Sequence, residues 1–332
     1  MKFGVRLPNS GPLANRNNIV QVADQAEKLG FHSVWVHDHI LWGTEQHRTH
    51  LSAGSAEALE ESQRPNFYES ITTLSYIAGR TSSVKLGVAV LVLPLRNPVV
   101  AAKQLANLDI LSGGRLMVGV APGAPNLTTH EFEAVGVDYE KRGKITDEYI
   151  SVLKKLWKDN LPSFSGSFTS FKEAQMFPKP SQKDLKVLIG GGERGISSRA
   201  LRRVVERGDG WIPAYLTPEE IREGRSQLKE KLPSVGREVS ELTIVHEMFT
   251  TINEKDELAV ASASRSLSTN FSSVDEGLRR SLVGTPKELV KRLEQYASAG
   301  VDVTELKFVY TDIPLLIDMM ELFASEVLPS FQ

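Results

Sequence analysis

The chain has 332 residues, 41% hydrophobic and 24% charged, a balance typical of a soluble globular protein with enough apolar material for a large core. A formal net charge of −2 gives no basic field for nucleic acid or an anionic membrane, so neither partner is expected. The absence of cysteine excludes disulfides and thiol nucleophiles and is consistent with a cytoplasmic protein.

The first segment predicts a strand, helix, strand unit. Phe3 to Leu7 is a short strand closed by turn-forming residues, and Ile19 to Leu29 has one apolar helical face that ends at Gly30. Ser33 to Val36 is the second strand. The short connection predicts a parallel pair with a right-handed crossover. This start lacks a long apolar run, so we expect neither a signal peptide nor a membrane span.

Residues 40–66 are polar and aperiodic and predict a long excursion, the kind of loop that usually forms a lid or a binding loop. A helix is predicted from Phe67 to Arg80. The next unit comprises a buried strand over Val84 to Leu93, a helix over Val99 to Leu111 and a strand over Leu116 to Val120. This last strand opens into a loop with little side-chain bulk, which suits the approach of a ligand.

The same alternation continues to the end of the chain. Leu161 to Pro180 combines Phe with Ser, Gly and Pro and predicts an insertion with short strands. Strands follow over Lys186 to Ile189, in GDGWIPA, over Leu242 to Ile252 and near the C-terminus, and Thr285 with Glu288 predicts a capping box. We therefore predict one domain over residues 1–332, an α/β fold built as a (β/α)8 TIM barrel with an excursion at 40–66 and an insertion at 161–180.

One stretch of the central unit, LPLRNPVVAAKQLANLDILSGGRLMVGVAPG, resembles the luciferase-like monooxygenase superfamily, the bacterial-luciferase-type flavin and deazaflavin oxidoreductases. Members carry a strand ending near R-x-P, a helix with LA..LD.LSGGR and a strand ending GVG.G. The resemblance extends from Phe3 to about Val309. It implies a flavin-type cofactor at the carboxyl ends of the barrel strands.

The sharpest polar pattern is VHDH, in which His37, Asp38 and His39 follow a buried strand directly. Taken alone, it is also compatible with a loop cap and solvated histidines. A metal site would need a third ligand that the sequence does not reveal, so no metal is predicted. The resemblance assigns His39 to the reactive face beside the cofactor and the substrate, and we expect Asp38 to orient the loop or to raise the basicity of an imidazole.

The ends of the neighbouring strands supply the predicted cofactor site. Triple glycines are often only tight turns, but bare backbone amides before a helix also suit a phosphate, and the family uses its GGG loop in this way. The residues assigned to cofactor binding are His37, Val90, Leu91, Ala121, Gly123, Gly190, Gly191 and Gly192.

Three functions follow from the resemblance. The deazaflavin branch typically shows S-D-H where this chain has HDH, which favours hydride transfer between coenzyme F420 and a small organic substrate. An FMN-dependent monooxygenase using reduced flavin and oxygen is the alternative, and a non-catalytic binding subunit is disfavoured by the retained HDH. Sugar-phosphate dehydrogenases of that branch carry a glutamate where this chain has Ala124 and Pro125, which disfavours such a substrate. Family members commonly dimerise, so we expect a homodimer that uses the helix over residues 67–80.

Overall fold

The computed structural model describes residues 1–41, 66–124, 128–192 and 194–332. The expected excursion at 40–66 lies almost entirely outside these ranges. Eight parallel strands form a closed barrel, with the ring closed by pairing of β10 with β11. In order around the ring, the barrel strands are β1 (Lys2–Arg6), β3 (Ser33–Val36), β5 (Lys85–Val92), β6 (Leu116–Ala121), β9 (Val187–Gly190), β10 (Gly210–Ile212), β11 (Thr243–Ile252) and β13 (Val303–Phe308). The predicted TIM-barrel fold is confirmed.

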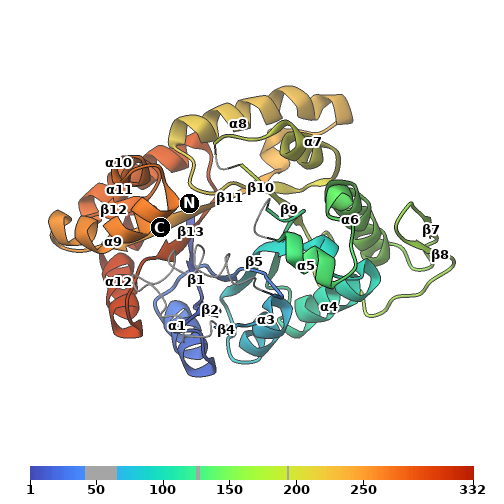
Figure 1. Ribbon diagram of the computed structural model, residues 1–332, viewed down its shortest axis with the longest axis horizontal. Coiled ribbons are helices and arrows are strands. Elements are labelled where there is room, and N and C mark those ends of the chain that lie inside the picture. The colour runs from blue at the N-terminus through green and yellow to red at the C-terminus, as the bar shows by residue number, and fades with distance from the viewer. Residues whose placement is uncertain (42–65, 125–127, 193) are drawn as a thin grey trace.

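Helices surround the barrel and cover the outward faces of its strands (Figure 1). The apolar face of each helix packs against the outward-facing side chains of the strands, and together these residues form the main core. The helices are α1 (Arg16–Lys28), α3 (Ser70–Ala78), α4 (Pro98–Leu111), α5 (Thr129–Ala134), α6 (Arg142–Lys158), α7 (Ser198–Arg207), α8 (Pro218–Lys231), α9 (Asp256–Asn270), α10 (Val274–Arg279), α11 (Pro286–Ala299) and α12 (Ile313–Glu326).

Among the described residues, five short strands lie outside the closed ring. β12 (Leu282–Gly284) extends the sheet beside β11, and β2 (Ser10–Gly11) pairs with β4 (Asn66–Phe67). β7 (Phe164–Ser165) and β8 (Ser170–Phe171) form an antiparallel hairpin within residues 161–180, which projects beyond α6 (Figure 1).

Two helix starts show how local sequence sets the element bounds. The capping box predicted at α11 is present, with Glu288 accepting a hydrogen bond of 2.8 Å from the backbone N–H of Thr285. The helix expected from Phe67 begins later, at Ser70, because the Glu69 side chain caps it by accepting from the N–H of Thr72 at 2.7 Å. Phe67 instead belongs to β4 and lies at the barrel mouth.

Alternation along the strands fills the barrel interior in layers. A lower layer is apolar and includes Trp35, Leu188, Val245 and Val303. Glycines make room for the large indole, since a Cβ atom at Gly87 would lie 2.1 Å from the Trp35 ring. The layer above it, nearer the carboxyl ends of the strands, is strongly polar. This change from apolar to polar places the candidate site.

Candidate functional site at the barrel mouth

A buried group of charged side chains forms one half of the upper layer, on β1, β11 and β13. The guanidinium of Arg6 bonds the Glu305 carboxylate through Nε, and its Nη2 lies 2.9 Å from Glu247 Oε2. Tyr215, in the loop after β10, donates to Glu247 Oε1 at 2.5 Å, and Lys307 Nζ lies 3.2 Å from the Tyr215 hydroxyl. One continuous network therefore links β1, β11, β13 and the β10 loop.

The same arginine fixes the protonation of His37. Arg6 Nη1 lies 2.5 Å from His37 Nδ1, and an arginine can only donate, so Nδ1 accepts. His37 Nε2 then carries the proton and donates to Ser10 Oγ at 2.6 Å. His37 is thus a member of the network and is held as the neutral imidazole. Its Nδ1 has no proton to donate.

Burial and mutual charge shift the titration of this network. Burial raises the pKa of Glu305 to about 7, the nearby Glu247 acts in the same direction, and Arg6 only partly opposes them. Burial alone would also raise the pKa of Glu247, but Arg6 and Lys307 lower it to about 2. Burial lowers the pKa of Lys307 to about 8, against the opposing effect of Glu247. The site therefore contains two groups that titrate near neutral pH.

A second polar pair lies at the end of β3. His39 Nδ1 is 2.8 Å from Glu131 Oε2, and this carboxylate, at the start of α5, is fully buried. The other Glu131 oxygen accepts from the N–H groups of Ile40 at 2.6 Å and Leu41 at 3.2 Å. Glu131 thereby fixes both the loop after β3 and the orientation of the imidazole, the arrangement that holds a histidine for acid–base chemistry.

Asp38 points away from the two histidines. Its carboxylate accepts from Arg96 at 2.6 and 2.7 Å, from Ser70 Oγ at 2.8 Å and from the N–H of Val92 at 2.9 Å. Arg96 also bonds Glu69 at 2.8 Å. Asp38 therefore ties the β3 loop to α3 and β5, and none of these bonds is made to His37 or His39.

The other half of the mouth is lined by small residues from β5, β6 and β9. Val90, Ala121 and Gly190 meet there, since a Cβ atom at Gly190 would lie 2.8 Å from Val90 Cγ1 and 3.4 Å from Ala121 Cβ. Gly190 itself is buried beneath Val90. Leu91 differs from the expectation: its side chain is fully buried in the core outside the barrel, because alternation along β5 turns it away from the mouth.

The loops after β6 and β9 carry the remaining predicted glycines. Gly123, Gly191 and Gly192 have φ values of 89°, 146° and 112°, which side-chain-bearing residues rarely adopt. Gly191 is exposed, and its carbonyl accepts from Trp211 Nε1 at 2.6 Å. The β9 loop leads into α7, whose start is capped by Ser197. Backbone N–H groups at such a helix start fit a phosphate.

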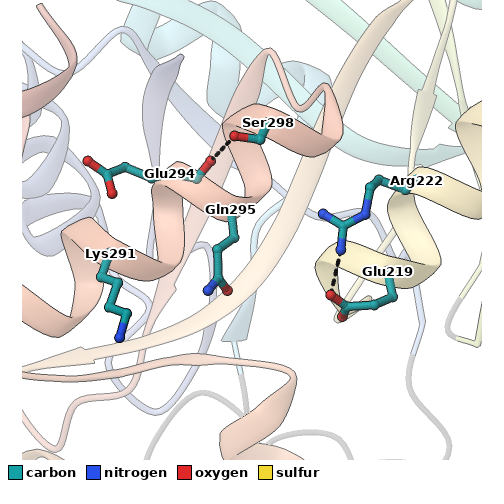
Figure 2. A pocket seen from close by; sticks show the side chains of 6 residues that line it. All are labelled: Glu219, Arg222, Lys291, Glu294, Gln295 and Ser298. Carbon is teal, nitrogen blue, oxygen red and sulfur yellow. Dashed lines mark hydrogen bonds and ion pairs between the residues drawn. The ribbon is translucent and has the colours of Figure 1, made fainter.

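A surface hollow elsewhere on the molecule does not belong to this site. It lies between α8 and α11, outside the barrel, and is formed by exposed polar side chains: Glu219, Arg222, Lys291, Glu294, Gln295 and Ser298 (Figure 2). In the part of the chain that the structure describes, no group of three or more His, Asp or Glu side chains is placed to hold a metal ion. Within the same residues, no helix is long and apolar enough to cross a membrane.

Several site residues could not be assigned from the strand ends alone. Arg6, Glu247, Glu305 and Lys307 lie within strands that are largely buried on both faces, and Glu131 lies 92 positions from its partner His39. A signal was present, because a charged residue within a strand that is buried on both faces needs a buried partner. Whether such a charged residue faces the barrel interior can be decided only when the register of the strands is known.

Comparison with known proteins agrees with this architecture. The profile of the family described as "Luciferase-like monooxygenase" matches residues 1–303. The chain belongs to this family. A luciferase-like relative, the FMNH2-dependent dimethylsulfone monooxygenase of Pseudomonas putida, is 26% identical over 301 residues, covering 80% of this chain and 78% of the relative. The F420-dependent glucose-6-phosphate dehydrogenase of Kineococcus radiotolerans is 30% identical over 58% of this chain and 51% of its own.

Solved structures with the luciferase-like fold extend over the whole chain. Monooxygenase RslO1 from Streptomyces bottropensis has a TM-score of 0.79 at 22% identity, with complete coverage of both chains. An F420-dependent secondary alcohol dehydrogenase, solved with an F420–acetone adduct, has a TM-score of 0.80 at 17% identity and covers 100% of this chain and 99% of its own. At these identities the likeness concerns the fold. The luciferase-like relatives include both FMN- and F420-dependent enzymes.

Proposed function

We propose that this luciferase-like oxidoreductase transfers a hydride between coenzyme F420 and a small organic substrate. The observation that carries the proposal is the His39–Glu131 pair at the strand ends, with a buried carboxylate 2.8 Å from His39 Nδ1. A carbonyl that accepts a hydride becomes an alkoxide and needs a proton. A histidine held by a carboxylate can polarise this oxygen and supply that proton near neutral pH.

The small-residue half of the mouth fits a planar cofactor. Val90, Ala121 and Gly123 would lie along the ring system, and Gly191 and Gly192 with the start of α7 would hold the phosphate through backbone N–H groups. The deazaflavin, when bound, would supply the hydride, and the protein supplies position and electrostatics. The polar half of the mouth would then face the substrate.

The protein's own steps concern a proton and its orientation. When both ring nitrogens of His39 carry protons, Nδ1–H donates to Glu131 and the proton passed to the substrate oxygen would come from Nε2, which leaves a neutral imidazole with its remaining proton on Nδ1. Asp38 acts at a distance by fixing the β3 loop to Arg96. Because Asp38 does not contact either imidazole in these bonds, we assign it a positioning role.

Cofactor binding tests the proposal directly. Purified protein is titrated with F420 and, separately, with FMN, and the absorbance and fluorescence changes give a dissociation constant for each. We expect saturable F420 binding at least about 10-fold tighter than FMN binding, a difference of about 1.4 kcal/mol. Reduced F420 should then be oxidised by a carbonyl substrate without consumption of oxygen. Tighter binding of FMN would overturn the assignment of the cofactor.

The second candidate is an FMN-dependent monooxygenase. It is supported by the dimethylsulfone monooxygenase, a relative that covers 80% of this chain. Tight FMN binding with oxygen consumption would establish it in place of hydride transfer to a carbonyl. A third candidate, a binding subunit without catalysis, predicts saturable cofactor binding without turnover of either kind.

A further inference from the structure

Lys307 occupies a distinctive position in the polar half of the mouth. It is the most distal of the lumen-facing positions on β13, following Val303 and Glu305. Its ammonium lies 4.5 Å from the centre of the Phe249 ring, which stacks on Tyr215 at 4.7 Å. The side chain is 12% exposed, whereas that of Glu305 below it is fully buried. Lys307 is thus the cation of the network that a ligand in the mouth could reach.

The hydrogen bonds of the other charged groups are largely taken up within the network. Arg6 directs its three nitrogens at Glu305, His37, Glu247 and the Ala89 carbonyl. Glu247 receives Arg6 on Oε2 and Tyr215 on Oε1. Because Arg6 and Glu247 already hydrogen-bond within the network, they have few donors or acceptors left for a ligand.

Lys307 has N–H donors that the network does not use. Among the described residues its ammonium makes one hydrogen bond, to the Tyr215 hydroxyl at 3.2 Å, and Glu247 Oε1 lies further away, at 3.8 Å. An ammonium has three N–H donors, so two remain. A buried ammonium is costly unless oxygen atoms satisfy it, and the 12% of the Lys307 side chain that is exposed lies at the carboxyl end of β13.

The charges of the network favour an anion at this position. Glu305 Oε2 is buried without a hydrogen-bond partner among the described residues, which disfavours an ionised carboxylate there. Burial raises the pKa of Glu305 to about 7, so below that pH Glu305 is protonated, and Arg6 and Lys307 provide two positive charges against the one negative charge of Glu247. His37 is held neutral by Arg6, and Tyr215 is neutral because burial and Glu247 raise its pKa.

We propose that Lys307 anchors an oxyanion group of the substrate, a carboxylate in the first instance, so that the enzyme acts on a small organic acid. The two unused N–H groups would donate to the carboxylate oxygens, and the reacting carbon would lie toward His39. This rests on the proposed function only for the reaction; the binding of the carboxylate does not depend on which cofactor is used.

Lysine-selective NMR tests the binding step. Protein labelled with ¹³C at the lysine ε carbon is titrated with acetate and propionate and, as neutral isosteres, with acetamide and propionamide, at pH 7. The Lys307→Met spectrum identifies the signal, and Lys291, in the outer hollow, is the control lysine. We expect saturable shifts of the Lys307 signal with the carboxylates, at least about 10-fold weaker effects with the amides, and no saturable response at Lys291.

Carboxylate binding should also change the titration of Lys307 itself. Burial lowers the pKa of the free ammonium to about 8, and a bound carboxylate favours the charged form, so the titration should move to higher pH. Equal responses to carboxylates and amides, or an unchanged titration at saturation, would overturn the proposal. If Lys307→Met fails to fold, Lys307→Arg keeps the charge and should retain carboxylate binding.

Steady-state turnover provides an independent test of the role of Lys307. Under F420-linked assay, Lys307→Met should lower kcat/KM for a hydroxy or oxo acid by roughly 10- to 100-fold, the scale of a lost hydrogen bond to a charged group, mainly by raising KM. Activity on the matching neutral alcohol or ketone should change little. Absence of F420 binding would refute the proposed function but leave the NMR result standing, whereas F420 turnover without a preference for acids would refute the role of Lys307 alone.

Discussion

At the residue scale, the proposed role of His39 as proton donor can be tested by one substitution. Replacing His39 by Ala removes the proton donor and should lower kcat by roughly 10²-fold or more, the scale of a lost acid–base group. The dissociation constant of the cofactor should change little, because His39 lies on the side of β3 and α5 and not in the glycine loops. Steady-state kinetics and a cofactor titration on the same preparation check both statements.

Glu131 provides the matched control for this role. Glu131→Gln keeps the size of the side chain and can still accept from the Ile40 and Leu41 N–H groups through its amide oxygen, but it removes the charge beside His39. We expect an intermediate loss of kcat in steady-state kinetics, because the neutral amide no longer stabilises positive charge on the imidazole during proton transfer. Wild-type turnover in His39→Ala would show that another group delivers the proton.

Sequence reasoning at this scale identified the loop but not its partners. The pattern VHDH is visible without a structure, and strand alternation would separate Asp38 from the two histidines. Glu131 could not be paired with His39 in the same way, because the contact depends on how α5 returns over the end of β3. Long-range pairing of this kind is a property of the closed barrel.

At the element scale, β11 makes stability depend on pH. His246 faces outward, and its Nε2 accepts from the N–H of Leu216 at 3.0 Å. Burial lowers the pKa of His246 to about 3, below the unfolded value of 6.5. The unfolded chain therefore takes up this proton first as the pH falls, so the stability is fully present above pH 6.5 and is lost towards pH 3.

This effect can be isolated with one variant. Between pH 6.5 and 4, wild-type protein should lose up to about 1.4 kcal/mol per pH unit from this proton, and His246→Gln, which can still accept from Leu216, should lose correspondingly less. Urea unfolding of both proteins at pH 7, 6 and 5 gives the two slopes. The contribution of Glu305, which has the opposite sign because its pKa is raised, is common to both and cancels in the difference. Parallel slopes would contradict the assignment.

The β9–α7 loop supports a prediction about the cofactor. Gly191→Val should raise the cofactor dissociation constant by roughly 10-fold or more, because the added side chain obstructs the backbone and lies close to Ala200, 3.1 Å from the new Cβ atom. Gly136→Val is the control, since its φ of 70° carries a backbone penalty but nothing lies within 4 Å of an added Cβ atom. Comparable affinity in the two variants would show that the loop does not hold the cofactor.

At the scale of the whole molecule, the barrel was predictable because its evidence is repetitive. Eight apolar strands alternate with amphipathic helices, and each unit alone suggests a parallel sheet. The polar layer above Trp35 was not predictable in this way. Arg6, Glu247 and Glu305 come from strands up to 299 positions apart, and only the register of the closed ring brings their charges together.

Only part of the apolar surface expected to form the homodimer interface is exposed. Ile71, Leu74 and Ile77 of α3 are buried in the core and cannot form an interface, but Tyr76 on the same helix is 43% exposed. The neighbouring helix α4 exposes Val100, at 53%. These helices lie side by side on the outside of the barrel (Figure 1). We therefore propose that α3 and α4 supply the interface between two copies.

A charged substitution tests this interface. In the proposed dimer, Val100→Glu would place a carboxylate among apolar side chains of the partner, where burying it unpaired is costly. We therefore expect the variant to sediment as a monomer, and the wild type as a dimer, at micromolar concentrations. Leu258→Glu is the matched control, because Leu258 is 48% exposed on α9, which lies on the other side of the barrel from α3 and α4 (Figure 1). Sedimentation velocity distinguishes the outcomes. A wild-type monomer would contradict the homodimer, and a dimer that survives in Val100→Glu would move the interface to another face of the barrel.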